Sequence, residues 1–258
     1  MYNINCPVHI NYRYLFRVIY MKKYALTLSA FLVLLTAVFI ISQRNTPQDK
    51  PSSAGTIRTQ RTIILDPGHG GFDGGATASD GTPEKDFNLQ IALKLKDYLS
   101  LAGFHVVMTR TQDVGTEAPG AETIREKKVS DIRSRMALVN DTPDCLLLSI
   151  HQNYFEDASC RGTQVFYSKN HPQSKIIAEY IQSGITLELQ PDNTRLVKAA
   201  GKEIYLLKNA QRPAVLVECG FISNSRETQQ LHNETYQQQL SFCIAKALFD
   251  YINTPEDG

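Results

Sequence analysis

The chain has 258 residues and a formal net charge of +1. A charge this close to zero gives no argument for a nucleic-acid partner, so we expect none. The composition is ordinary for a soluble globular protein, and the absence of low-complexity stretches and internal repeats excludes a repeat architecture.

An apolar segment near the N-terminus predicts a membrane anchor. Residues 24–41 carry no charge and are about as long as the shortest membrane-spanning helices. Lys22 and Lys23 precede the segment, and positive charge on that side predicts a cytoplasmic tail at residues 1–23 with the remainder extracytoplasmic. Because no clean small-x-small cleavage pattern follows, we favour an uncleaved anchor over a cleaved signal peptide, whose removal would leave a secreted protein.

The sequence around this segment also predicts the other boundaries. Met21 is followed directly by two lysines, like the start of a signal, so we hypothesise that residues 1–20 are not native. Residues 42–60 are rich in Pro, Ser, Thr and Gly, which predicts a linker. Residues 61–254 are long enough for one domain with a substantial core.

Apolar runs of strand length alternate with amphipathic helical stretches in this domain. Strands are predicted at residues 61–66, 104–109, 145–150, 163–167 and 214–218. Helices are predicted at residues 87–101, 121–139, 173–187, 226–231 and 236–252. The order predicts an α/β fold, a three-layer sandwich in which helices flank a mostly parallel central sheet. In such folds, ligands bind at the carboxyl ends of the strands.

Polar side chains occur where three of these apolar runs end. His69 follows the first run, His151 follows the third, and Glu218 ends the last. Glu84 opens the first helical stretch and is a fourth candidate. Two imidazoles and a carboxylate form a common catalytic zinc set that leaves one position for water, and a second carboxylate can accept the proton of that water.

Each of these residues also has a structural interpretation. A single histidine after a strand is more often an ordinary loop residue, and Glu84 could be only a favourable charge in the first turn of its helix. Glu218 is harder to dismiss, because it interrupts an apolar run and an unpaired buried carboxylate is costly. Asp66 could orient the loop or the ring of His69 from outside the ligand set.

The cysteines do not indicate a thiolate metal site, because none of the five forms a CxxC pair. Buried free thiols are the simpler interpretation. Cys219 directly follows Glu218, and strand alternation predicts that its side chain points away from the site.

Five stretches of the sequence together resemble the zinc-dependent N-acetylmuramoyl-L-alanine amidases of the Amidase_3 family. They are TIILDPGHGGFDGGA, EKDFNLQIALKLKDYL, VVMTRTQD, SIHQN and AVLVECGFISN. The resemblance implies that His69, Glu84 and His151 bind one Zn²⁺ per chain and that Glu218 is the catalytic glutamate. It places Asn153 at a polar, substrate-lining position of the cleft. Gln152 departs from the small residue common in the family, which would alter the cleft wall but not the ligand set.

The resemblance implies that residues 61–254 form a zinc amidase domain acting on peptidoglycan. The reaction is hydrolysis of the lactyl amide between N-acetylmuramic acid and L-alanine, with Glu218 carrying the proton from water to the departing nitrogen. Ser149 and Cys219 are then not nucleophiles. No long inserted helix that could block the cleft is predicted between Tyr167 and Leu206, so the enzyme would be open or controlled by an activating protein partner.

The stretch DNTRLVKAAGKEIYLLKNAQRPAVLVECGF more narrowly resembles the sporulation branch of the family, the germination-specific amidases of endospore formers. This branch implies a role in forming muramic-δ-lactam in the spore cortex. Two other functions stay open: a zinc peptidase that cuts the stem peptide, and a non-catalytic wall-binding protein.

Overall fold

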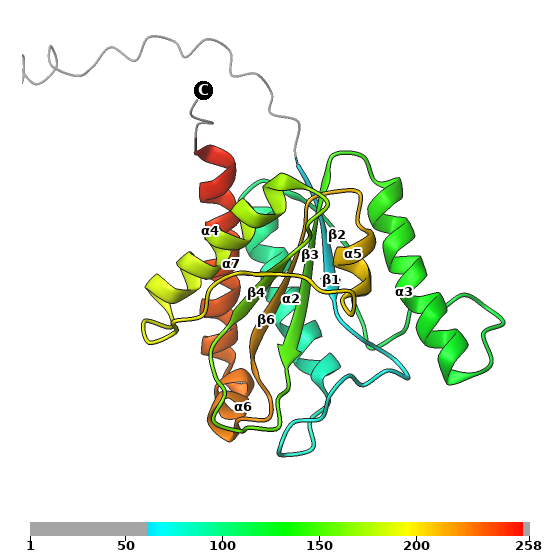
Figure 1. Cartoon of the computed structure of the whole chain (residues 1–258), viewed down its shortest axis with the longest axis horizontal. Coiled ribbons are helices and arrows are strands. Elements are labelled where there is room, and N and C mark those ends of the chain that lie inside the picture. The colour runs from blue at the N-terminus through cyan, green and yellow to red at the C-terminus, as the bar shows by residue number, and fades with distance from the viewer. Residues whose placement is uncertain (1–60, 255–258) are drawn as a thin grey trace, which may run out of the picture. The chain divides into compact units, whose positions relative to one another are not determined.

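The computed structural model describes residues 61–254 (Figure 1). The predicted cytoplasmic tail, membrane anchor and linker lie outside this range. Within residues 61–254, no helix combines the length and the apolar character that a membrane span needs.

A six-stranded sheet forms the centre of the domain, in the order β2-β1-β3-β6-β4-β5. The first four strands in this order run parallel to one another, whereas β4 runs antiparallel to β6 and parallel to β5. The predicted mostly parallel sheet is therefore confirmed. The strands are β1 (Thr62–Pro67), β2 (His105–Met108), β3 (Cys145–Asn153), β4 (Gln164–Tyr167), β5 (Lys198–Ala199) and β6 (Ala214–Phe221).

Helices cover both faces of the sheet, as predicted for a three-layer sandwich (Figure 1). One face carries α2 (Glu84–Leu101), α4 (Pro172–Glu188), α6 (Ser225–His232) and α7 (Glu234–Asn253). The opposite face carries α3 (Ile124–Asp141) and the short α5 (Tyr205–Asn209).

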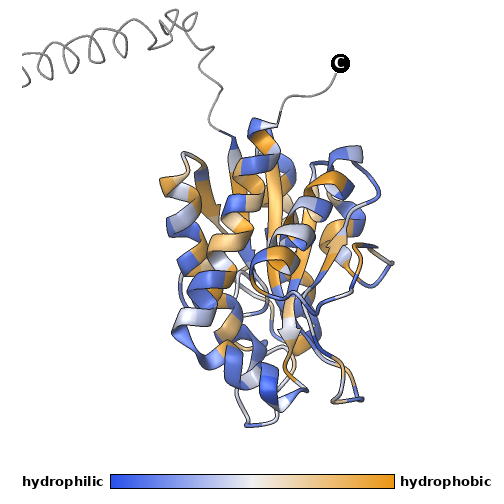
Figure 2. Ribbon diagram, turned by 90° about the vertical axis from the view of Figure 1, so that its left-hand side faces the viewer, coloured by the Kyte–Doolittle hydropathy of each residue, from blue (hydrophilic) through white to orange (hydrophobic). Residues whose placement is uncertain are grey.

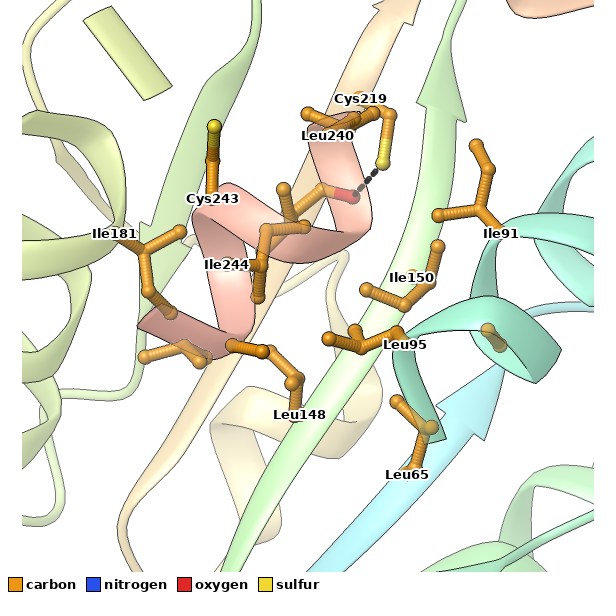
Figure 3. Close-up of a cluster of buried hydrophobic side chains, with 14 of the residues drawn as sticks. Leu65, Ile91, Leu95, Leu148, Ile150, Ile181, Cys219, Leu240, Cys243 and Ile244 are labelled. Carbon is orange, nitrogen blue, oxygen red and sulfur yellow. Dashed lines mark hydrogen bonds between the residues drawn. The ribbon is translucent and has the colours of Figure 1, made fainter. Parts of the chain in front are cut away.

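Side-chain alternation along β1 shows why its sequence is apolar throughout. Ile63 and Leu65 belong to the larger core cluster beneath α2, α4 and α7, whereas Ile64 belongs to the smaller cluster beneath α3 and α5. A strand buried on both faces needs apolar residues at every position. The hydropathy colouring shows apolar strands between helices with polar outer surfaces (Figure 2), and Figure 3 shows part of the larger cluster.

The strands that carry site residues extend further than predicted. β3 continues to Asn153 and β6 continues to Phe221, so His151 lies within its strand rather than after it, and Glu218 lies within its strand rather than at its end. Pairing across the ladder accounts for the difference, because the Cα atoms of His151 and Glu218 are register partners. A polar residue can continue a strand when its backbone is paired on the neighbouring strand.

Local capping accounts for the start of α3, which was predicted three residues too early. Thr123 and Glu126 form a capping box, in which the Thr123 hydroxyl accepts from the Glu126 backbone and the Glu126 carboxylate accepts from the Thr123 backbone. The short elements β5 and α5 were not predicted, because neither carries a periodic apolar pattern long enough to recognise.

Candidate metal centre

Three of the predicted site residues converge at the carboxyl ends of β1 and β3. His69, Glu84 and His151 each offer a ligand atom, and these atoms all lie within 4.8 Å of one another. His69 follows β1, Glu84 is the first residue of α2, and His151 lies near the end of β3. The two imidazole rings meet edge to face, with centroids 5.0 Å apart.

Glu84 lies between the two histidines. Its Oε1 is 2.9 Å from Nδ1 of His151, and its Oε2 is 3.2 Å from Nε2 of His69. Burial raises the pKa of Glu84, but hydrogen bonds from both histidines outweigh burial, so its pKa lies well below its usual range. The carboxylate therefore stays ionised, as a metal ligand must.

Three further hydrogen bonds fix the Glu84 carboxylate. Its Oε2 accepts from the backbone N–H of Ala76 at 3.0 Å, and its Oε1 accepts from the Gln152 backbone at 3.1 Å and the Asn88 amide at 3.2 Å. Gln152 is 3% exposed and its amide donates to Asn88 at 3.1 Å. The expectation that Gln152 alters the cleft wall is therefore wrong: its side chain points into the interior and supports the residue that holds Glu84.

His69 has a left-handed backbone conformation, with φ of 62°. A residue other than glycine adopts this conformation at a cost of roughly 1 kcal/mol or more, so the surrounding structure must stabilise it. Arg135 donates to the carbonyl of His69 at 2.7 Å, and Arg110 donates to the carbonyl of Gly68 at 3.0 Å. Both arginines also donate to the carbonyl of Pro67. The loop that presents His69 is thus held by two guanidinium groups.

Asp66 holds this loop through Arg135 and makes no contact with the His69 ring, so its predicted role on the ring is wrong. Its Oδ1 accepts from Arg135 at 2.6 Å, and hydroxyl groups of Ser149 and Thr109 complete its hydrogen bonds. Burial raises the pKa of Asp66, but Arg135 and the two hydroxyls outweigh it and lower the pKa from 3.8 to about 2. Strand alternation directs Asp66 toward α3, which carries Arg135.

Replacing Arg135 with methionine is expected to lower the free energy of unfolding by about 3–5 kcal/mol, because Asp66 would be left buried without its cation. Since the folded pKa of Asp66 is depressed, the contribution of the pair is present above the unfolded pKa and is lost as the pH falls from 3.8 toward 2. Urea unfolding at pH 7 and at pH 3 measures both effects. The double variant Asp66→Asn/Arg135→Met should regain part of the loss; a single variant as stable as wild type at pH 7 would contradict the assignment.

Asp73, which we did not predict, orients the His69 ring. Its Oδ2 is 2.8 Å from Nδ1 of His69, and its Oδ1 is 3.0 Å from Nζ of Lys128 on α3. Burial lowers the pKa of His69, but the hydrogen bonds to Asp73 and Glu84 outweigh burial and raise it to about 9. A carboxylate on the second ring nitrogen is the usual orienting partner of a metal-binding histidine. The only indication of this role in the sequence was that Asp73 follows His69 by four residues.

Asp73→Ala is expected to weaken metal affinity by roughly 10–100-fold, the usual cost of removing such a partner. Competition with a chromophoric chelator measures the change in Kd. Lys128→Gln is the matched control, because Lys128 contacts the other oxygen of Asp73 and is largely exposed, and it should have a smaller effect. An unchanged Kd in Asp73→Ala would exclude the orienting role.

Glu218 lies beside the three converging residues. Directly opposed residues of neighbouring strands share a face, so Glu218 shares the face of its register partner His151. Its Oε2 is buried and has no hydrogen-bond partner among residues 61–254. Burial raises its pKa to about 7; the charge of Glu84 adds to the increase, and His151 opposes it. A carboxyl group with a pKa near neutrality can both accept and release a proton.

The side chain that follows Glu218 along β6 points away from the site, as predicted. Cys219 points into the larger core cluster, where its Sγ lies 3.8 Å from the carbonyl oxygen of Val217 (Figure 3). Asn153 ends β3 on the same side as His151, and its side chain is half-buried. Its backbone carbonyl accepts from Ile222 at 2.9 Å. The role of Asn153 toward substrate stays a prediction.

The backbone around the three converging residues leaves no room for additional side chains. A Cβ atom at Gly68 would lie 2.1 Å from Nε2 of His151, and one at Gly75 would lie 2.6 Å from Oε2 of Glu84 and 2.7 Å from Cδ2 of His69. The two glycines thus let the backbone approach the ligand atoms closely. Two imidazoles and one ionised carboxylate, beside a second carboxylate with a free oxygen, fit a divalent ion that accepts nitrogen and oxygen ligands.

The family model described as N-acetylmuramoyl-L-alanine amidase matches residues 63–250. A germination-specific N-acetylmuramoyl-L-alanine amidase from Bacillus subtilis (strain 168) is 31% identical over 237 residues, which are 92% of this chain and 99% of the relative.

Solved structures share the fold as well as the sequence. The CwlD amidase from Clostridioides difficile, solved in complex with the GerS lipoprotein, has a TM-score of 0.73 and 37% identity, covering 76% of this chain and 100% of that chain. An N-acetylmuramoyl-L-alanine amidase from Clostridium difficile 630 has a TM-score of 0.66 and 30% identity, covering 77% and 99%.

Proposed function

This chain belongs to the N-acetylmuramoyl-L-alanine amidase family, and from its site we infer that it is a zinc enzyme. Its activity is hydrolysis of the lactyl amide between N-acetylmuramic acid and L-alanine in peptidoglycan. The observation that carries the zinc proposal is the convergence of His69, Glu84 and His151, with the free oxygen of Glu218 beside them.

His69, Glu84 and His151 would hold the zinc ion, which supplies a Lewis acid that polarises the amide carbonyl and acidifies water. Glu218 would accept a proton from the attacking water, since its pKa is raised by burial. It would then return that proton to the L-alanine nitrogen, because an unprotonated amine is a poor leaving group. Asp73 would keep the His69 ring in place throughout.

The position of the two candidate nucleophiles supports direct attack by water. Ser149 is completely buried, and its hydroxyl donates to Asp66 at 2.7 Å. Cys219 is completely buried in the core, and burial raises the pKa of its thiol far above neutrality. Neither side chain is accessible to a substrate, so the proposal needs no covalent intermediate.

We extend the proposal to the biological setting by analogy. The curated relative is named germination-specific, which supports a role in forming muramic-δ-lactam in the spore cortex. The solved relative in complex with a lipoprotein supports an activating protein partner. We also propose that residues 24–41 anchor the enzyme in the membrane with residues 61–254 on the extracytoplasmic side. Fractionation of cells that produce the full chain or a variant lacking residues 1–41 tests the anchor.

Digestion of purified peptidoglycan, with and without a chelator, tests the reaction. The proposal predicts new L-alanine amino termini and intact glycan strands by mass spectrometry, with loss of both the termini and the activity after chelation and recovery on adding Zn²⁺. Cleavage within the stem peptide would instead indicate a peptidase. Intact peptidoglycan under all conditions would indicate a binding protein.

A further inference from the structure

Arg195 lies in the segment between α4 and β5, and its guanidinium group packs against the end of the sheet that carries the metal centre. Its Nε donates to the carbonyl of Arg161 at 2.7 Å, and its Nη1 donates to Oε1 of Gln164 at 3.4 Å. Its guanidinium carbon lies 4.6 Å from the centre of the Phe221 ring. Stacking on an aromatic ring holds a guanidinium in one plane.

The residues beneath Arg195 are the cross-strand neighbours of the site. Gln164 on β4 is the register partner of Glu218, and Phe221 on β6 is the register partner of Asn153. Opposed residues on neighbouring strands share a face of the sheet. Because Arg195 donates to Gln164, it lies on the face of the proposed catalytic carboxylate, and it makes no hydrogen bond with Glu218.

The positive charge of Arg195 lacks a direct partner among residues 61–254. It makes no ion pair there, and its Nη2 makes no hydrogen bond. Its charge acts on Glu227, but the oxygens of that carboxylate accept from the backbone N–H groups of Gly162 at 2.9 Å and Phe221 at 2.8 Å. Each oxygen of Glu227 thus already accepts a hydrogen bond from the backbone. The Nη2 edge of the Arg195 guanidinium therefore remains free to bind a ligand.

We propose that Arg195 determines specificity by binding a free carboxylate of the peptide that leaves with L-alanine. This inference rests on the proposed function. The stem peptide of peptidoglycan carries free carboxylates beyond the scissile amide, and a planar guanidinium matches a carboxylate better than any other side chain does. A guanidinium fixed over Phe221, outside the reacting atoms, would place that end of the substrate.

A pair of soluble substrates separates this role from a structural one. The first is an N-acetylmuramoyl peptide with free carboxylates, and the second is the same compound with its carboxylates converted to amides. Wild-type kcat/KM should be roughly 10–100-fold higher on the first, as expected for a hydrogen bond between charged groups. Arg195→Gln should lose most of this preference by slowing only the first reaction, and Arg195→Lys should keep part of it.

Arg161→Gln is the matched control, because Arg161 is an exposed neighbour whose carbonyl, and not its side chain, contacts Arg195. It should leave the preference unchanged. Equal kcat/KM of wild type on the two substrates would overturn the inference. An equal loss on both substrates in Arg195→Gln, with a lower melting temperature or zinc content, would assign Arg195 a structural role and also overturn it.

Failure of the proposed function would look different, since wild type would then hydrolyse neither substrate. In that case, isothermal titration calorimetry of the two peptides with the zinc-loaded wild-type protein tests whether Arg195 binds a carboxylate. Tighter binding of the acid peptide, lost in Arg195→Gln, supports the carboxylate site, and equal Kd values overturn it.

Discussion

Replacing Glu218 with glutamine is expected to reduce kcat by roughly 10²–10⁴-fold while leaving the metal in place. The carboxylate is not among the three converging ligand residues, and its Oε2 is buried and has no hydrogen-bond partner within residues 61–254. Glutamine keeps the shape of the side chain but cannot accept and return a proton. Turnover of an N-acetylmuramoyl peptide and zinc content by mass spectrometry measure the two effects separately.

The stability of the same variant provides a second readout. Because burial raises the pKa of Glu218 from 4.5 to about 7, the fold disfavours its ionised form, and this cost grows as the pH rises from 4.5 and is complete above 7. Metal-free Glu218→Gln should therefore melt no lower than metal-free wild type at pH 8. Glu179→Gln, at an exposed position on α4, is the control for both measurements. Near wild-type turnover in Glu218→Gln would disprove the catalytic role.

Removing His69 is expected to abolish stoichiometric metal binding, and with it nearly all activity. One imidazole and one carboxylate would remain of the three protein ligands that a catalytic zinc site usually needs. His69→Ala removes the ring, and His69→Gly removes it without the strain that a side chain suffers at φ of 62°. Zinc content after dialysis and Kd by chelator competition measure the loss.

His105→Ala is the matched control, because His105 is exposed on β2 and is not one of the converging residues. It should bind one zinc ion per chain with unchanged Kd. If His69→Gly retained stoichiometric zinc at wild-type affinity, His69 would not be a ligand. Far-ultraviolet circular dichroism should show that both His69 variants keep the fold.

The convergence of the ligand residues could be predicted because it follows from topology. Alternating strands and helices lead to a parallel sheet, and the carboxyl ends of parallel strands meet at one edge. Residues as far apart in the chain as His69 and His151 must then lie close together wherever their strands are neighbours. Glu84 was identifiable because it opens the helix that begins at the same edge.

The ends of the strands could not be predicted from apolar residues alone. β3 and β6 continue through His151 and Glu218 because each backbone is paired with the other across the ladder. Hydropathy reports which side chains are buried, whereas pairing depends on the neighbouring strand. The predicted strands therefore ended at Ile150 and Glu218, three residues before the observed ends of β3 and β6.

Local patterns and residue types were enough to predict the fold class and the chemistry of the ligand set. The groups that support that set could be identified only from the packing of the folded chain. Asp66 and Asp73 flank His69 equally well along the chain, but one points to Arg135 and the other to the imidazole. Gln152 is buried, and Arg195 stacks on Phe221. Such contacts join side chains from distant elements, and their directions depend on packing rather than on local periodicity.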